Sequence, residues 1–293
     1  MAPPLGEKAV LAVDPGFRSG CKLACLDAQG SLLHHETIFP LEPYTRTDEA
    51  AARLNALTHA YGIEVIAVGN GTGGREALSF FRETTEGRDG APVAVSVNEA
   101  GASVYSASRT AREELPEQDV TVRGAISIGR RLMDPLSELV KIDPKSIGVG
   151  QYQHDVDQKL LDSRLRDTVV SCVNAVGVEL NTASEHLLRY VSGISQKTAR
   201  AVVSYRQEHG PFRSRESLRD VPGVGEKTFE QAAGFLRVRN GAHPLDASAV
   251  HPERYGLVER IAADLGVAVA DLVGDGDLCK RIEAEHYVDE EAG

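Results

Sequence analysis

The sequence predicts an α/β domain with a mixed sheet, followed by a region that is all α. Three observations carry this prediction. Up to about residue 140, short apolar runs typical of strands alternate with runs of helical spacing. From Val156 onward the strand-type runs stop, and apolar residues recur at helical spacing. Within this helical half, residues 191–199 recur as residues 221–229 at an offset of 30.

The first forty residues predict a three-stranded antiparallel meander, because apolar runs alternate with turn signals such as Pro15-Gly16 and Gln29-Gly30. Two helices and two further strands follow, and a last helix is expected over residues 125–140. The strands are expected at residues 9–13, 21–26, 31–38, 65–68 and 93–97, and the helices before the last at 49–61 and 75–84. The order β-β-β-α-β-α-β is typical of a mixed sheet with helices packed on it.

A long helix opens the second half, and its apolar stripe is more typical of a core-facing helix than of an exposed spacer. The stripe consists of Leu160, Leu161, Leu165, Val169, Val170, Val173 and Val176. Stretches rich in Gly, Pro and polar residues over 143–150 and 240–252 are linker candidates. We therefore divide the chain into an α/β domain (1–145), a linker with the long helix (146–182), a tandem repeat (183–240) and a C-terminal part (241–293).

The composition is that of an ordinary globular protein. Of 293 residues, 42% are hydrophobic and 26% charged, which excludes collagen, coiled coil and wholesale disorder. No apolar run approaches the roughly 18 residues of a membrane span, and the first ten residues lack a signal-peptide layout, so we expect a cytoplasmic protein without membrane contacts. The four cysteines lack zinc-site spacing, so we expect reduced thiols, no metal and no cofactor.

Charge is distributed unevenly along the chain. The net charge of −11 argues against a surface that binds nucleic acid everywhere. Residues 183–240, however, carry 10 Lys and Arg against 6 Asp and Glu, and acidic segments flank them on both sides. A basic island of this kind is typical of a local module that contacts phosphate, and it is also common in inert domains.

The repeat lies inside this basic island. It aligns Val191-Ser-Gly-Ile-Ser-Gln-Lys-Thr-Ala199 with Val221-Pro-Gly-Val-Gly-Glu-Lys-Thr-Phe229, so that a valine, a glycine, a lysine and a threonine match. Apolar residues precede and follow each copy at helical spacing, which predicts helix, hairpin, helix. The Pro-Gly-Val-Gly-x-Lys-Thr pattern of the second copy resembles the helix-hairpin-helix motif.

The second hairpin carries four candidate nucleic-acid-binding residues. Gly223 and Gly225 allow positive φ and let amide N–H groups approach a phosphate with no side chain in between. The following helix start adds free donors and the positive end of its dipole. Lys227 adds a charge and Thr228 a hydroxyl. None of these groups reads base identity, so the predicted contact is to the RNA or DNA backbone.

The matching candidates in the first hairpin are Gly193, Lys197 and Thr198. Ser195 stands where the second copy has its second glycine. We expect this hairpin to hold phosphate less well than the second, and the alternative is that it serves only as a packing corner.

Two carboxylates are expected at strand ends in the α/β domain. Asp14 ends the first strand and Glu99 follows the strand over 93–97. In an RNase H-like sheet those two strand tips lie side by side, and clustered carboxylates there can hold Mg²⁺ for phosphodiester hydrolysis. The third acid expected at the start of the last helix is missing, and we place Arg123 at its position. A guanidinium beside two carboxylates disfavours a metal, so we expect Asp14 and Glu99 to be vestigial.

Four blocks together resemble the Tex family of bacterial transcription accessory proteins. They are Asp14-Pro-Gly-Phe-Arg-Ser-Gly-Cys-Lys22, Gly69-Asn-Gly-Thr72, Glu99-Ala-Gly-Ala-Ser-Val-Tyr-Ser106 and the run from Lys141 to Val156. The runs Phe229–Leu236, His243–Asp246 and His251–Glu253 resemble this family too. The resemblance implies an RNase H-like domain of the YqgF type over 1–145, tandem helix-hairpin-helix units over 183–240, and an incomplete third unit around residues 255–273 within the part 241–293. The tail of that part, residues 275–293, is acidic, and we expect it to fray. The family's N-terminal helical region and C-terminal OB-fold RNA-binding domain have no counterpart in these residues.

Three functions remain open at this point. The first is a non-enzymatic, monomeric scaffold that binds RNA or DNA backbone and works with transcription or ribosome-associated proteins, as the resemblance implies. The second is a metal-dependent nuclease of RNase H or RuvC type that uses Asp14 and Glu99. The third is a module that binds protein alone, with the long helix as a spacer. A remote fourth is an actin-like ATPase, because the Asp14-Pro-Gly turn is similar in that fold.

Overall fold

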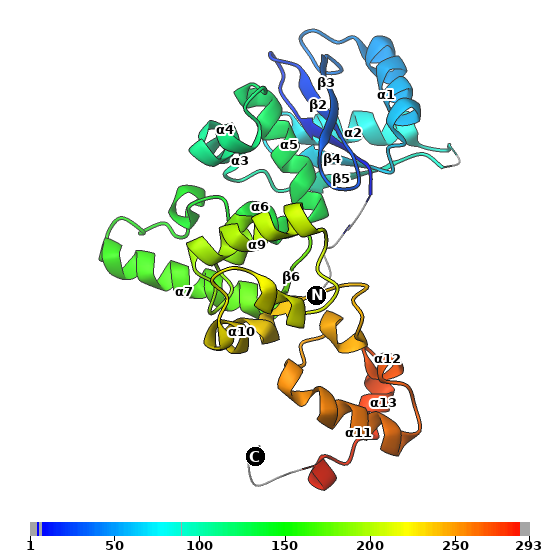
Figure 1. Cartoon of the computed structure of the whole chain (residues 1–293). Helices are drawn as coiled ribbons and strands as arrows, with labels where there is room; N and C mark the ends of the chain where they lie inside the picture. The colour runs from blue at the N-terminus through cyan, green and yellow to red at the C-terminus, as the bar shows by residue number, and fades with distance from the viewer. Residues whose placement is uncertain (1–4, 6–7, 89, 288–293) are drawn as a thin grey trace. The chain divides into compact units, whose positions relative to one another are not determined.

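The computed structural model describes residue 5, residues 8–88 and residues 90–287. The chain forms two compact units, Met1–Leu161 and Asp162–Gly293, which run from blue to green and from green to red in Figure 1. Over the described ranges, no helix is both long enough and apolar enough to cross a membrane.

The first unit is built on a five-stranded sheet in the order β3-β2-β1-β4-β5. Its strands are β1 (Val10–Asp14), β2 (Cys21–Leu26), β3 (Leu32–Ile38), β4 (Val65–Gly69) and β5 (Val93–Val97). The first three form the predicted antiparallel meander, and β4 and β5 join β1 in parallel. The predicted mixed sheet is confirmed, with every strand within one residue of its expected bounds.

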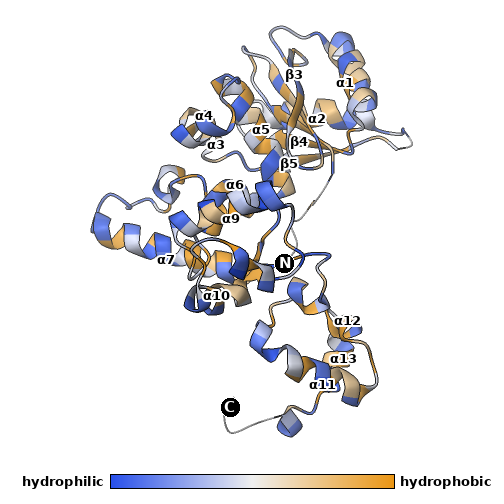
Figure 2. Ribbon diagram, in the orientation of Figure 1, coloured by the Kyte–Doolittle hydropathy of each residue, from blue (hydrophilic) through white to orange (hydrophobic). Residues whose placement is uncertain are grey.

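Helices cover both faces of this sheet, as Figure 1 shows. On one face lie α1 (Thr47–Tyr61) and α2 (Gly74–Thr85). On the other lie α3 (Ala102–Ala107), α4 (Arg109–Glu114) and α5 (Val120–Met133), and α5 contacts β1, β2 and β4. Figure 2 shows largely hydrophobic strands between helices that have hydrophilic outer surfaces.

The central strand β1 explains why the sheet needs both layers. Successive strand residues point to opposite faces. Leu11 and Val13 therefore join the core beneath α1 and α2, while Val10 and Ala12 join the core beneath α5. Because both faces are buried, the strand is apolar throughout until Asp14 at its carboxyl end.

The single helix predicted over residues 125–140 is wrong in its bounds. Helix α5 begins earlier, because the Asp119 carboxylate caps it by accepting from the amides of Thr121 and Val122. It ends at Met133, and α6 (Pro135–Leu139) starts afresh. Pro135 has no backbone N–H, so it cannot continue α5 but suits the first position of a new helix. The 3₁₀ turn η1 (Pro144–Ile147) follows.

The predicted long helix is α7 (Gln158–Val176). Its expected role in the core is wrong, because Val173 is the only one of its residues that is buried, and Leu160 is 57% exposed. Helical periodicity identified the helix correctly. The packing of the stripe depends on neighbours that periodicity does not specify.

The second unit then forms the tandem repeat. Its elements are β6 (Val178–Glu179), α8 (Glu185–Leu188), α9 (Gln196–His209), η2 (Glu216–Asp220), α10 (Glu226–Ala232), η3 (Ala233–Phe235) and β7 (Leu236–Arg237). The short strands β6 and β7 pair in parallel, with Val178 opposite Leu236. This pairing brings the start and the end of the tandem repeat together.

The residues after the repeat are helical. They form η4 (Pro244–Ala247), η5 (Pro252–Arg254), α11 (Tyr255–Leu265), α12 (Val269–Leu272), α13 (Gly276–Lys280) and η6 (Ala284–Tyr287). Gly266, with φ of 68°, ends α11 before α12, as expected for a third helix pair. The acidic tail, expected to fray from residue 275, begins with α13, which the Asp275 carboxylate caps. Residues 288–293 lie outside the described residues.

Candidate nucleic-acid interface

The two copies of the repeat have the same backbone construction. Ser184 and Ser214, which are 30 residues apart, each accept from an amide three residues later at 3.3 Å. In each hairpin the fourth residue donates to the first, from Ile194 to Val191 and from Val224 to Val221, both at 3.0 Å. Gly193 and Gly223, the third residues of the two hairpins, have φ of 84° and 90°, in the region that favours glycine. The predicted helix, hairpin, helix units are therefore present.

Gly225 does not use a positive φ as predicted. Its φ is −94° and it is the N-cap of α10. The value of glycine here lies in the side chain that it lacks. Other good N-cap residues carry a side-chain oxygen that accepts from an amide of the first turn, and glycine leaves those amides available.

The first hairpin packs against α10 on the side where a Gly193 side chain would lie. A β-carbon on Gly193 would lie 2.8 Å from Gln231 Cβ and 3.2 Å from the Thr228 carbonyl oxygen, so α10 lies against this hairpin. Ser195 caps α9 and accepts from the Thr198 amide at 3.1 Å. The buried Thr198 hydroxyl lies 2.9 Å from the Ser195 hydroxyl. Of the three predicted binding residues here, Gly193 and Lys197 are exposed and Thr198 is buried.

The second hairpin is open. A β-carbon on Gly223 or Gly225 would meet no atom of the described residues within 4 Å. Lys227 is exposed, and it has no hydrogen-bond or ion-pair partner within the described part of the chain. Thr228 is half-buried. Exposed glycine amides next to an unpaired ammonium form the arrangement that receives a backbone phosphate.

Arg219 offsets negative charge on this surface. Glu226 follows Gly225 directly, and a free carboxylate there would repel a phosphate. Arg219 pairs with Glu226 and also with Glu216, whose Oε2 lies 2.7 Å from its Nε. Its guanidinium lies over the Phe229 ring, 3.8 Å from the centroid. Sequence reasoning did not single out Arg219.

The two predicted carboxylates of the first unit come together, although their strand tips are not neighbours. Strand β4 lies between β1 and β5, which corrects the expected side-by-side arrangement. Glu99 extends over the turn that ends β4. A β-carbon would lie 1.6 Å from Glu99 Oε1 if placed on Gly71, and 2.3 Å from Glu99 Oε2 if placed on Gly69. The glycine-rich loop lets the carboxylate reach across toward Asp14.

Burial, and then the charge of Glu99, raise the pKa of Asp14 to about 6, and Lys22 partly offsets both effects. The Lys22 ammonium itself donates to the carbonyls of Ser19 and Gly20 at 2.7 and 3.1 Å. Glu99 Oε2 is buried and has no hydrogen-bond partner among the described residues. The two carboxylates therefore lie in a poorly compensated acidic site.

The placement of Arg123 beside the carboxylates is wrong. Its guanidinium donates to the carbonyls of Leu115 and Pro116, at 3.1 and 3.4 Å, which holds it away from the sheet end. Gly124 faces the site instead, because a β-carbon there would lie 3.3 Å from Asp14 Oδ2. A shift of one residue turns a helical side chain by about 100°, so an error of one residue in the alignment exchanged the two.

A different arginine supplies positive charge near Glu99. Arg131 is buried, and its Nη1 donates to the carbonyls of Asn98 and Ala100 at 2.9 and 2.7 Å. Burial lowers its pKa, and the charges of Glu138 and Glu99 oppose that shift. With glycine at position 124, these residues do not fit the carboxylate set of a two-metal nuclease. The described residues contain no group of three His, Cys, Asp or Glu side chains placed to hold a metal.

Comparison with known families matches the whole arrangement. The Tex protein YqgF-like domain matches residues 8–133, the helix-hairpin-helix motif residues 173–237, and an HHH domain residues 243–293. Protein tex of Bordetella pertussis is 51% identical over the whole chain, and the transcriptional accessory protein Tex of Neisseria gonorrhoeae is 49% identical. The human S1 RNA-binding domain-containing protein 1 is 40% identical over 96% of the chain.

A YqgF-type, RNase H-like domain joined to helix-hairpin-helix units places this chain among proteins with nucleic-acid-binding motifs. Within that class it belongs to the Tex family. The chain spans 37%, 38% and 33% of the lengths of these bacterial and human relatives.

Proposed function

We propose that this chain binds the sugar-phosphate backbone of RNA or DNA without reading base sequence, as a non-enzymatic module of a transcription accessory protein. The observation that carries the proposal is the open second hairpin, with Gly223, Gly225 and the unpaired Lys227 at the surface. The helix-hairpin-helix match over residues 173–237 supports the same contact. The packing of Gly193 and the Ser195 cap favour the second hairpin over the first.

Affinity from one such hairpin is expected to be modest and strongly dependent on salt. Amide donors and an ammonium recognise phosphate oxygens, and binding releases counterions from the nucleic acid. No group of the hairpin is suited to reading a base edge. We therefore expect little difference between sequences of equal length.

The names of the relatives support a role in transcription. One relative is named a transcriptional accessory protein, and the human relative is named for an RNA-binding domain. We propose that this chain acts beside the transcription machinery as a monomer, with contacts to its proteins. The absence of a carboxylate from Gly124 favours a role without catalysis, and Asp14 and Glu99 then remain as a vestigial pair.

The test compares two lysines at equivalent positions of the repeat. Binding of labelled single-stranded and duplex RNA and DNA is measured by fluorescence anisotropy over a series of salt concentrations. Lys227→Glu should weaken binding to all probes alike and reduce the slope of log affinity against log salt by about one. Lys197→Glu, the matched control, should have a much smaller effect. Equal losses from both variants would contradict the assignment to the second hairpin.

The same titrations test catalysis when Mg²⁺ or Mn²⁺ is included and the probes are examined for cleavage at the end. Intact probes support the non-enzymatic proposal. Cleavage that disappears in Asp14→Asn would instead establish the nuclease alternative. Tight binding of proteins by a chain that binds no probe would favour the protein-interaction alternative.

A further inference from the structure

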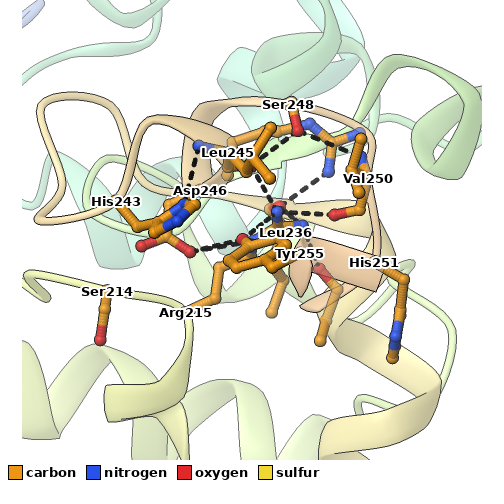
Figure 3. Close-up of polar contacts among 12 residues, drawn as sticks. Ser214, Arg215, Leu236, His243, Leu245, Asp246, Ser248, Val250, His251 and Tyr255 are labelled. Atoms are coloured by element: carbon orange, nitrogen blue, oxygen red, sulfur yellow. Dashed lines mark hydrogen bonds and ion pairs between the residues drawn. The ribbon is translucent and has the colours of Figure 1, made fainter. Parts of the chain in front are cut away.

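The most deeply buried charged side chain in the second unit is that of Arg215, which is 1% exposed. Figure 3 shows its guanidinium surrounded by backbone carbonyls, the Asp246 carboxylate and the Tyr255 hydroxyl. Its Nε lies 3.3 Å from Asp246 Oδ1, and the Tyr255 hydroxyl donates to the same oxygen at 2.7 Å. A buried charge of this kind is tolerated only where partners surround it.

The carbonyls that Arg215 binds come from two parts of the unit. Nη1 donates to Ala233 at 2.8 Å, at the end of the helical segment that follows the second hairpin. Nη2 donates to Leu245 and Val250 at 2.5 and 2.7 Å. We call residues 243–287 the C-terminal element. Arg215 itself precedes η2, which leads into the hairpin, so one guanidinium joins both sides of the second hairpin to the C-terminal element.

A second contact ties the same two parts together. His251, in the C-terminal element, places Nε2 3.0 Å from the carbonyl oxygen of Glu230 in α10. Its ring also lies against Gly234, where a β-carbon would be 3.2 Å from His251 Cδ2. The helix that follows the second hairpin is therefore held from the C-terminal element at two places.

At the equivalent position of the first copy, the described residues hold no buried arginine. The residue 30 positions before Arg215 is Glu185, which is half-buried and pairs with Arg200 at 3.1 Å. That carboxylate has no N–H groups with which to bind carbonyls. The buried arginine is thus specific to the second hairpin, the one that is open at the surface.

We propose that Arg215 is a positioning residue for the second hairpin, which it holds in its binding geometry by fastening both sides of the hairpin to the C-terminal element. The proposal rests on the proposed function where it concerns phosphate. A planar guanidinium with five N–H donors can serve carbonyls on two sides at once. A lysine at the same place keeps the charge but has three donors on one atom, so it cannot bridge the two parts in the same way.

Hydrogen exchange of the full chain tests the positioning without any ligand. The reporters are the amides of Val224 and Phe229, whose 3.0 Å bonds to Val221 and Gly225 close the hairpin and the first turn of α10. Arg215→Lys should raise exchange at both reporters about tenfold, which is about 1.4 kcal/mol of protection. Arg206→Lys is the matched control, because Arg206 donates to the Leu180 carbonyl at 3.0 Å from the first copy. It should leave both reporters unchanged.

If Arg215→Lys raises exchange only within residues 245–255 and leaves both reporters unchanged, the proposal is overturned. If Arg215→Lys fails to fold, Tyr255→Phe provides the second variant. It removes the hydroxyl that bridges Arg215 and Asp246 but keeps the ring, which stacks on His243 at 4.5 Å. A smaller rise at the same reporters is expected, and unchanged reporters would again overturn the proposal.

Binding then tests whether Arg215 acts through the hairpin. Arg215→Lys should weaken the binding of a single-stranded RNA probe about tenfold in the otherwise unchanged chain. In a Lys227→Glu background the further loss should shrink to within about twofold, because the hairpin is already disabled. Additive losses would place Arg215 outside the hairpin's action. If the unchanged chain binds no probe, the proposed function fails, while the exchange measurement still decides the positioning role.

Discussion

Gly193 of the first hairpin lies so close to α10 that a β-carbon on it would be 2.8 Å from Gln231 Cβ. The first hairpin is thereby used to pack the two copies of the repeat together. At the equivalent position of the second copy, Gly223 has open space around it in the described structure. Two hairpins of the same backbone shape therefore differ in their surroundings: the first packs against α10, and the second has open space at its glycine.

This difference predicts unequal effects of alanine at the two glycines. Both substitutions place a β-carbon at positive φ, which costs about 1–2 kcal/mol. Gly193→Ala adds a clash with α10, so we expect a total loss of about 2–4 kcal/mol in the free energy of unfolding of the second unit. Gly223→Ala should lose only the about 1–2 kcal/mol that a β-carbon at positive φ costs. Urea unfolding followed by circular dichroism measures both, and equal losses would show that α10 yields to the added methyl group.

The glycine N-cap of α10, Gly225, leads to a second prediction, on stability and phosphate binding. Gly225→Ser should give α10 the cap that Ser195 gives α9, with Ser Oγ accepting from the Thr228 amide. Stability should stay within a few tenths of a kcal/mol, while phosphate binding weakens several-fold because the serine occupies a donor. The reciprocal Ser195→Gly should not create a binding site, since Gly193 still packs against α10. A gain in affinity from Ser195→Gly would contradict the assignment of the first hairpin to packing.

The acidic site predicts a pH dependence. Because the pKa of Asp14 is raised from its ordinary 3.8 to about 6, the folded chain binds this proton more tightly than the unfolded chain. The resulting stability is present below about pH 4 and is lost as pH rises through 6. Asp14→Asn removes the charge. Its free energy of unfolding should therefore exceed that of the unchanged chain by about 1–2 kcal/mol at pH 7, allowing for screening by water. The difference should vanish near pH 4, and urea midpoints across this range measure it.

The corrected helix register predicts a contrast between neighbouring residues. Gly124→Asp should raise the pKa of Asp14 above 6, because the new carboxylate lies beside Asp14 Oδ2. Arg123→Asp should leave that pKa unchanged, since its side chain turns toward Leu115 and Pro116. Titration of the Asp14 carboxyl carbon by NMR measures both. A larger shift from Arg123→Asp would restore the original placement.

Much of the fold could be predicted because its signals are local. Short apolar runs mark most of the strands from β1 to β5, and turn residues such as Pro15-Gly16 and Gln29-Gly30 separate the first three strands. The offset of 30 predicted the two hairpins, because the valine and the glycine that both turns share suit the same turn bonds. The exposed Lys227 was also found in this way.

The errors concern residues whose position depends on contacts between distant segments. Arg123 was placed one residue from the correct helix face. The apolar stripe of α7 was expected to lie in the core, and of its residues Val173 alone is buried. Arg215 gave no signal, because the arginine has no equivalent in the first copy and the carbonyls that it binds are 18, 30 and 35 residues away in the sequence.

Local patterns in the sequence were enough to predict the five strands of the first unit, their order along the chain, the repeat and the family to which the chain belongs, since these follow from apolar runs, turn residues and matching blocks. Only the tertiary structure decided which hairpin is open, how Glu99 reaches over the β4 turn toward Asp14, and what surrounds Arg215. The physical reason is how far apart in the sequence the interacting residues are. Backbone preferences act between neighbours in the chain, whereas exposure, desolvation and buried hydrogen bonding depend on which distant segments pack together.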